Sequence, residues 1–196
     1  TTNALTINTP TTTVNLESGK FAKVIATTAS NTLIVGDGTI IEDLTVSKGN
    51  VKICAGGQIT GSITYTGTDA IYLILGPGVT SDDIPSTING NITVMHGFDN
   101  KELSYALYDR LGAGMVVLDG DGYAMMTQDN IDAVTELDFG WNNYHITSLS
   151  GIEYFVNLEY LTCSDSGLAM CDLSQNTKLR NANIQQNQMQ SLDFSN

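Results

Sequence analysis

The sequence predicts a mixed, β-rich fold with some α-helix, in which an N-terminal all-β domain precedes a helical cap and a short leucine-rich-repeat array. Three observations lead to this prediction. Apolar residues recur at fixed spacings over residues 134–196, short β-branched runs divided by Gly and Asn fill residues 14–97, and a helical apolar stripe lies between them. We therefore expect three segments: a linker over 1–13, a strand-rich repeat domain over 14–97, and the cap plus about three repeats over 98–196.

The N-terminal part repeats a plan of an apolar strand, a glycine-rich corner and a second strand. The repeats begin at Leu33, Val51, Ile71 and Ile92, at steps of 18, 20 and 21 residues. Repeats of this length favour a small parallel β-solenoid. An antiparallel β-sandwich is the alternative, because regularly spaced short strands fit that architecture too. The preceding residues 1–13, rich in Thr and Asn, predict a linker or a loose first strand.

A helix is predicted over residues 99–111. Asp99 or Asn100 can cap its first turn, and Gly112 follows its last residue. The apolar residues of this segment stand at helical spacing and form one stripe: Leu103, Ala106, Leu107 and Leu111.

The segment after this helix contains a fragment of a calcium-loop pattern. With Gly122 at the sixth position of an EF-hand loop, Asp119 and Asp121 fall on ligand positions 3 and 5. Val117 and Gln128 then occupy positions 1 and 12, where carboxylates are needed, so the loop is degenerate. Ca²⁺ is the single cofactor that the sequence suggests. The alternative is an Asp/Gly turn that leads into a helix over residues 127–134.

The C-terminal part carries the clearest repeat. Three sets of five residues share the spacings 3, 2, 3 and 2: Val134, Leu137, Phe139, Asn142 and Tyr144; Leu158, Leu161, Cys163, Ser166 and Leu168; and Leu179, Ala182, Ile184, Asn187 and Met189. This pattern is typical of leucine-rich repeats, in which a short strand points apolar residues inward. Ser166 and Ala182 depart from the expected Asn and Leu.

Composition and charge restrict the function. The net charge is −13, and only eight Lys and Arg residues are scattered through the chain, which argues against a nucleic-acid partner. Residues 1–95 contain 4 basic and 7 acidic residues, whereas 96–196 contain 4 and 14, so −3 and −10 belong to the two parts. No apolar run is long enough to span a bilayer. Two isolated histidines, His96 and His145, and the absence of nucleophile or metal-ligand motifs predict no enzyme.

Residues 98–196 resemble the internalin-like group of bacterial cell-surface leucine-rich-repeat proteins. The likeness rests on Phe98-Asp99-Asn100-Lys101-Glu102-Leu103, on Ile146-Thr147-Ser148-Leu149 and on Asn157-Leu158-Glu159-Tyr160-Leu161. The resemblance implies a secreted, surface-exposed protein that binds protein or glycan without catalysis. The first half of the chain lies outside it.

In such arrays the strand positions between the inward residues face the concave side and form the binding strip. These positions are Glu136, Asp138 and Gly140; Tyr160, Thr162 and Ser164; and Asn181, Asn183 and Gln185. Trp141 is a further candidate if it is exposed, and a core residue if it packs on the cap.

The sequence thus predicts a non-catalytic, extracellular adhesion or recognition module that binds protein or glycan through this strip. The alternative is a glycan-binding or polysaccharide-processing protein that uses the N-terminal β domain. Because terminal repeats normally need capping, we also expect a homodimer through the uncapped C-terminal repeat.

Overall fold

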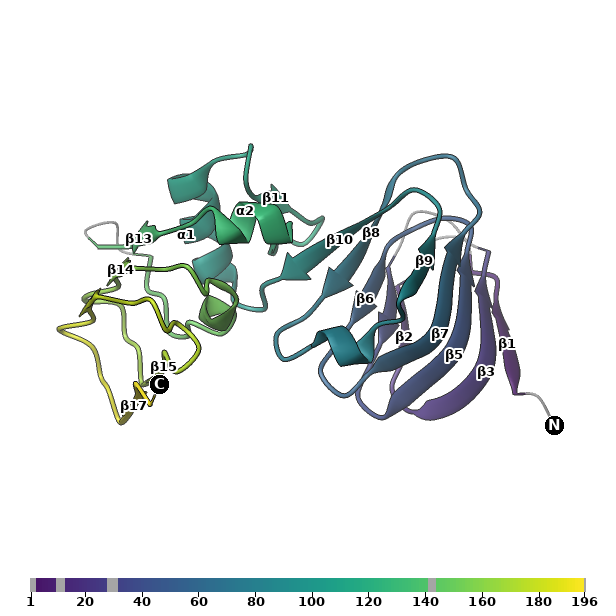
Figure 1. Cartoon of the computed structure of the whole chain (residues 1–196), viewed down its shortest axis with the longest axis horizontal. Coiled ribbons are helices and arrows are strands. Elements are labelled where there is room, and N and C mark those ends of the chain that lie inside the picture. Colours follow the sequence, from purple (N-terminus) through teal and green to yellow (C-terminus); the bar gives the residue numbers. More distant parts are fainter. Residues whose placement is uncertain (1–2, 10–12, 28–31, 141–143, 196) are drawn as a thin grey trace. The chain divides into compact units, whose positions relative to one another are not determined.

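The computed structural model describes residues 3–9, 13–27, 32–140 and 144–195. The chain divides into two compact units, Thr1–Met95 and His96–Asn196 (Figure 1). Each unit has its own hydrophobic core, so each is described by itself.

In the first unit, consecutive strands alternate between two sheets. The first sheet has the strand order β1 (Ala4–Ile7), β3 (Gly19–Ala26), β5 (Thr39–Val46), β7 (Gln58–Tyr65) and β9 (Thr87–Asn89). The second follows the order β2 (Val14–Leu16), β4 (Leu33–Val35), β6 (Val51–Ile53), β8 (Ile71–Leu75) and β10 (Ile92–Gly97). The pairings from β1 to β9 are parallel wherever their register is defined, and a short 3₁₀ helix, η1 (Ser81–Asp83), precedes β9.

Parallel register stacks identical kinds of side chain in the core of this unit. Leu33, Val51 and Leu73 occupy equivalent positions on β4, β6 and β8, and all three are buried. The middle residues of the short strands β4 and β6 are only partly buried, so these strands alternate between inward and outward faces. Burial of these rows of apolar side chains provides the main stabilisation.

One glycine permits an irregularity in the long strands. The register between β5 and β7 shifts between Ile41 and Asp43. A Cβ atom on Gly61 would lie 2.5 Å from the Glu42 carbonyl oxygen, which no side chain can accept. Gly61 therefore allows the two backbones to approach at the bulge.

The second unit begins with an antiparallel sheet and a helix. The end of β10 pairs with β12 (Ala124–Met126), which pairs with β11 (Val117–Leu118). Helix α1 (Lys101–Leu111) packs on both β11 and β12, and the Asn100 side chain caps it by accepting a hydrogen bond from the Leu103 N–H at 2.7 Å. Helix α2 (Gln128–Asp132) is capped in the same way by Thr127.

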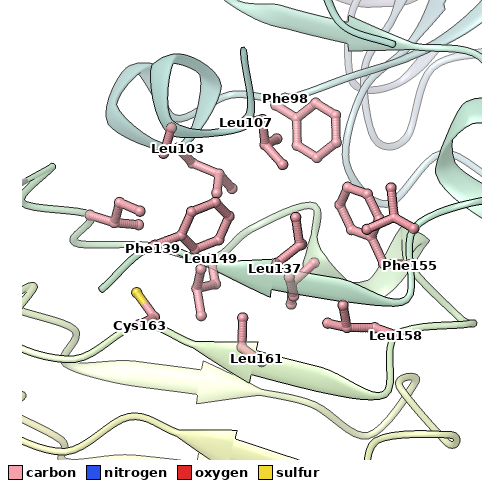
Figure 2. Close-up of a cluster of buried hydrophobic side chains, with 14 of the residues drawn as sticks. Phe98, Leu103, Leu107, Leu137, Phe139, Leu149, Phe155, Leu158, Leu161 and Cys163 are labelled. Carbon is pink, nitrogen blue, oxygen red and sulfur yellow. The ribbon is translucent and has the colours of Figure 1, made fainter. Parts of the chain in front are cut away.

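Short parallel strands fill the rest of this unit. The first group is β13 (Glu136–Asp138), β14 (Tyr160–Thr162) and β16 (Asn181–Asn183); the second is β15 (Met170–Asp172) and β17 (Ser191–Asp193); a 3₁₀ helix, η2 (Ile152–Tyr154), lies between β13 and β14 in the sequence. Figure 2 shows side chains of α1, β13 and β14 in one buried cluster, to which the fully buried Cys163 also belongs. Cys163 and Cys171 are both buried and unbridged, as small core residues.

Two side-chain amides, of the buried Asn176 and the partly buried Asn187, tie together the backbone of successive turns in this unit. Asn176 is fully buried, and its Nδ2 donates to the carbonyls of Ile152 at 2.8 Å and Phe155 at 3.0 Å. The Oδ1 of Asn187 accepts the N–H groups of Ser166, Gly167 and Leu168 at 3.0, 2.9 and 3.1 Å. The turn that contains Ser166 instead of Asn is therefore held by an amide from the next level.

The fold class predicted from the sequence is wrong. The described part of the chain is mostly β, with two α-helices and open sheets that are parallel or mixed, and it contains neither a helical cap nor a leucine-rich-repeat array. The repeated spacing of apolar residues arises from short parallel strands. This spacing does not specify the structure of the segments that connect the strands. Helix α1 packs on the β11–β12 pair, and α2 follows β12 in the sequence. The strands of this pair are too short to show a periodic pattern of apolar residues in the sequence.

For residues 14–97 the sequence predicts a β-solenoid, with an antiparallel β-sandwich as the alternative. The observed arrangement is a pair of open sheets between which successive strands alternate. Parallel pairing excludes the antiparallel sandwich directly. Strand β1 lies within the segment 1–13, where we expected a linker or a loose first strand.

The Asn187 contacts predict a measurable loss of stability. Asn187→Ala leaves three backbone N–H groups without their acceptor, and we expect the free energy of unfolding of the second unit to fall by about 2 kcal/mol. The measurement is urea denaturation together with amide hydrogen exchange, in which Ser166, Gly167 and Leu168 should lose protection. The neighbouring exposed Gln188→Ala is the control and should change stability by less than about 0.5 kcal/mol. Equal effects of the two substitutions would contradict the assigned role.

Candidate functional site

The structure places six of the residues expected in the binding strip in two parallel rows. Glu136, Tyr160 and Asn181 are register partners across β13, β14 and β16, and so are Asp138, Thr162 and Asn183. We call these six residues the polar rows.

Alternation along each strand explains why the polar rows face outward. The residue between the two rows is Leu137 in β13, Leu161 in β14 and Ala182 in β16. Leu137 and Leu161 are buried and Ala182 is partly buried, because a strand points successive side chains to opposite faces. Packing of these three residues fixes the strands, and the strands fix the polar rows.

The polar rows change in chemical character from strand to strand. β13 contributes two carboxylates, β14 an aromatic ring and a hydroxyl, and β16 two amides. Tyr160 is 46% exposed, which is unusual for a large ring. The Asp138 carboxylate accepts the Gly140 N–H at 2.9 Å, so this side chain is held in place before any ligand arrives.

The remaining residues expected in the strip have different positions. Gln185 lies beyond the end of β16, where its carbonyl accepts a hydrogen bond from the Asp165 N–H at 3.1 Å. Gly140 and Ser164 lie close together: a Cβ atom placed on Gly140 would be 3.8 Å from the Ser164 Oγ. Trp141 lies outside the described residues, so the structure does not place it.

The calcium-loop fragment forms the turn between β11 and β12. One oxygen of the Asp119 carboxylate accepts the N–H groups of Asp121 at 2.9 Å and Tyr123 at 2.8 Å, and the Asp119 N–H donates to the Tyr123 carbonyl at 2.8 Å. Gly122 completes the turn with a φ of 87°. In the described residues, no group of three or more His, Cys, Asp and Glu side chains is gathered as a metal site. Calcium binding by Asp119 and Asp121 stays a prediction.

A histidine and a tyrosine, both partly buried, are packed together in the second unit. The rings of His96 and Tyr154 have centroids 4.7 Å apart, and both the His96 Nδ1 and the Tyr154 hydroxyl are buried without a hydrogen-bond partner. Burial lowers the pKa of His96, although the Gln128 side chain and the Asp132 carboxylate oppose this shift. Burial also raises the pKa of Tyr154, so both groups are held in their neutral forms.

A pocket that the sequence did not predict lies on the exposed face of α1. It is a shallow hollow of about 470 Å³, lined by Tyr105, Tyr108, Asp109 and Tyr144. Tyr105 and Tyr108 stand three residues apart and off the apolar stripe of the helix, a signal that would have identified an exposed aromatic pair. The sequence could not predict that Tyr144 lines this pocket, because Tyr144 is 35 residues from its hydrogen-bond partner Asp109.

Comparison of the chain with protein-family models, with curated proteins and with solved structures gave no match. The resemblance to internalin-like surface proteins therefore stays a prediction.

The β11–β12 turn predicts a difference between its two aspartates. Asp119→Ala removes the acceptor of two backbone N–H groups and should lower the free energy of unfolding by about 1–2 kcal/mol. Asp121→Ala, at the exposed tip, should change it by less than about 0.5 kcal/mol. Thermal unfolding measures both variants. A Ca²⁺-dependent rise in melting temperature that a chelator reverses and Asp119→Ala abolishes would instead assign the loop to calcium.

The partly buried His96 ring predicts a pH dependence of stability. Below about pH 6.5 the unfolded chain takes up a proton on His96 that the folded chain resists, so stability should fall as the pH falls through this range. Urea midpoints at pH 7.5 and 5.5 measure the effect, and His96→Phe should reduce the difference between them. His145→Asn removes the other histidine and serves as the control. An unchanged difference in His96→Phe would rule out His96 as the source.

Proposed function

We propose that the chain is a non-catalytic recognition module that acts outside the cell and binds protein or glycan through the polar rows. The proposal rests on the register of β13, β14 and β16, which gathers residues from three separate segments on one exposed face. The resemblance of residues 98–196 to bacterial surface proteins supports an extracellular location.

The chemistry of the polar rows suits a ligand rich in amides or hydroxyls. Carboxylates accept hydrogen bonds, amides donate and accept, and the tyrosine ring adds apolar area together with a hydroxyl. Neighbouring strands are about 4.8 Å apart, so each row presents its groups at a regular interval. Short side chains on paired strands lose little conformational entropy when they bind, which favours recognition by a preformed surface.

Flanking contacts help to keep this face rigid. The Arg180 guanidinium pairs with the Glu159 carboxylate at 3.3 Å, immediately before β16 and β14. The Arg180 and Asn181 N–H groups both donate to the Glu159 carbonyl, at 2.8 and 3.2 Å. These contacts hold the entry of two strands that carry the polar rows.

No helix in the described part of the chain is long and apolar enough to cross a membrane.

The homodimer expected through the C-terminal repeat has one feature in its favour. Met170, Leu192 and Phe194, on or next to β15 and β17, are large apolar side chains that are 68%, 42% and 50% exposed. Self-association of the chain stays a prediction.

A second candidate function, glycan binding or polysaccharide processing by the N-terminal unit, is favoured by one pocket. A hollow of about 460 Å³ lies on the outer face of β3, β5 and β7, and its lining includes Lys20, Phe21, Glu42 and Thr60. An aromatic ring beside polar groups suits a sugar. Glycoside hydrolysis ordinarily needs two carboxyl groups, and Glu42 is the one carboxylate among the described residues that line this pocket. Binding is therefore the better form of this alternative.

The test is binding of the intact chain to a printed glycan array and to a panel of purified extracellular-matrix proteins. For a ligand of the polar rows, Tyr160→Ala and the double variant Asn181→Ala/Asn183→Ala should each weaken binding at least about tenfold. Gln190→Ala, an exposed amide outside the rows, is the matched control and should leave binding unchanged. Ligands that survive both row variants would refute the proposal. Their loss in Phe21→Ala would move recognition to the N-terminal unit.

A further inference from the structure

The pocket on α1, which we call the tyrosine pocket, differs in composition from the polar rows. Three tyrosines and one aspartate make up its whole described lining. Tyr105 and Tyr108 are 50% and 38% exposed, although tyrosine rings normally bury most of their surface. Aromatic rings gathered on an open surface are suited to contact with a ligand.

The groups that line the pocket define the chemistry of that ligand. The face of a tyrosine ring carries partial negative charge and attracts C–H groups that are polarised by neighbouring oxygens. The Asp109 carboxylate accepts hydrogen bonds and repels anions, and the phenolic hydroxyls can donate or accept. A ligand that meets all of these conditions is uncharged, has a C–H face and carries hydroxyl groups. We propose that the tyrosine pocket binds pyranose units of a neutral glycan.

The size and openness of the pocket support a sugar over a small cation. A volume of about 470 Å³ falls in the range of small-molecule sites, which is roughly 300–1,000 Å³. A quaternary ammonium ion is best held by rings that surround it, whereas this pocket is shallow. A flat ring lies on such a surface and keeps its hydroxyl edge in water. The cation–π contact found nearby lies outside the pocket: the Lys101 ammonium is 5.4 Å from the centroid of the Tyr123 ring.

Three of the four pocket residues, Tyr105, Asp109 and Tyr144, have contacts within the unit before any ligand binds. The Tyr144 hydroxyl hydrogen-bonds to the Asp109 carboxylate, which links the loop after β13 to the helix. The Arg110 guanidinium donates to the Gly140 carbonyl at 3.2 Å and anchors the same end of α1. At the other side, the Tyr105 hydroxyl lies against Gly122, where an added Cβ atom would be only 2.9 Å away. Such preorganisation lowers the entropic cost of binding.

This inference goes beyond the proposed function, because the tyrosine pocket is separate from the polar rows and needs none of their residues. Each can therefore fail alone. Tyr160 provides the comparison, since it is a tyrosine of similar exposure in the same unit but in the rows.

The test is calorimetric and NMR titration of the intact chain with three uncharged oligosaccharides: cellotetraose, the tetramer of N-acetylglucosamine and mannotetraose. We expect at least one to bind and to shift the ring resonances of Tyr105, Tyr108 and Tyr144. Tyr108→Ala and Tyr105→Ala should each weaken that binding at least tenfold. Tyr108→Phe keeps the ring and should weaken that binding less than Tyr108→Ala does, and the control Gln190→Ala, an exposed amide outside both surfaces, should leave it unchanged.

Several outcomes would overturn the inference. These are the absence of binding by all three oligosaccharides at 10 mM, binding that survives both alanine variants, or binding of tetramethylammonium in place of the sugars. Loss of binding in Tyr160→Ala alone would place the glycan on the polar rows, and would support the proposed function while refuting the tyrosine pocket. The ring resonances of the parent chain decide the case even if an alanine variant does not fold.

Discussion

The Asn187 side-chain amide is the contact on which the second unit depends most. Its Nδ2 donates to the Cys163 carbonyl at 2.7 Å and to the Ile184 carbonyl at 2.8 Å, the residues that directly follow β14 and β16. Its Oδ1 accepts three consecutive N–H groups of the turn between β14 and β15. One side chain therefore satisfies the backbone of two levels and fixes the strands that carry the polar rows. Three-residue strands form few ladder hydrogen bonds, so the bonds of this side chain add substantially to the hydrogen bonding that holds them.

Much of the local structure could be predicted from the sequence, because local patterns determine it. Helix α1 and its Asn100 cap follow from helical spacing and capping chemistry, and the repeat starts at Leu33, Val51 and Ile71 coincide with β4, β6 and β8. The connections could not be predicted. The spacing of apolar residues indicates which side chains face inward. It does not distinguish a helix from an extended segment between two strands, because both are compatible with the same spacing. The cap and leucine-rich-repeat array were inferred from that spacing, and this step failed.

The two candidate surfaces show the same limit of prediction from the sequence. The alternation of the polar rows is a property of each strand and can be read from Glu136–Asp138 or Tyr160–Thr162 alone. The tyrosine pocket depends on a tertiary contact, because Tyr144 reaches Asp109 across 35 residues. In the repeat pattern Tyr144 occupies an inward position, and its ring is in fact partly buried against the core. Its hydroxyl, which the pattern ignores, reaches the pocket.

Two hydrogen bonds connect helix α1 to the polar rows. Arg110, next to Asp109 of the tyrosine pocket, donates to the Gly140 carbonyl, and the Gly140 N–H donates to the Asp138 carboxylate of the polar rows. Helix α1, which carries three of the four pocket residues, is therefore linked through Arg110 and Gly140 to the polar rows. A ligand long enough to engage both would gain from the high effective concentration of the second contact once the first is made. A ligand too short to reach from one surface to the other would gain nothing from this effect.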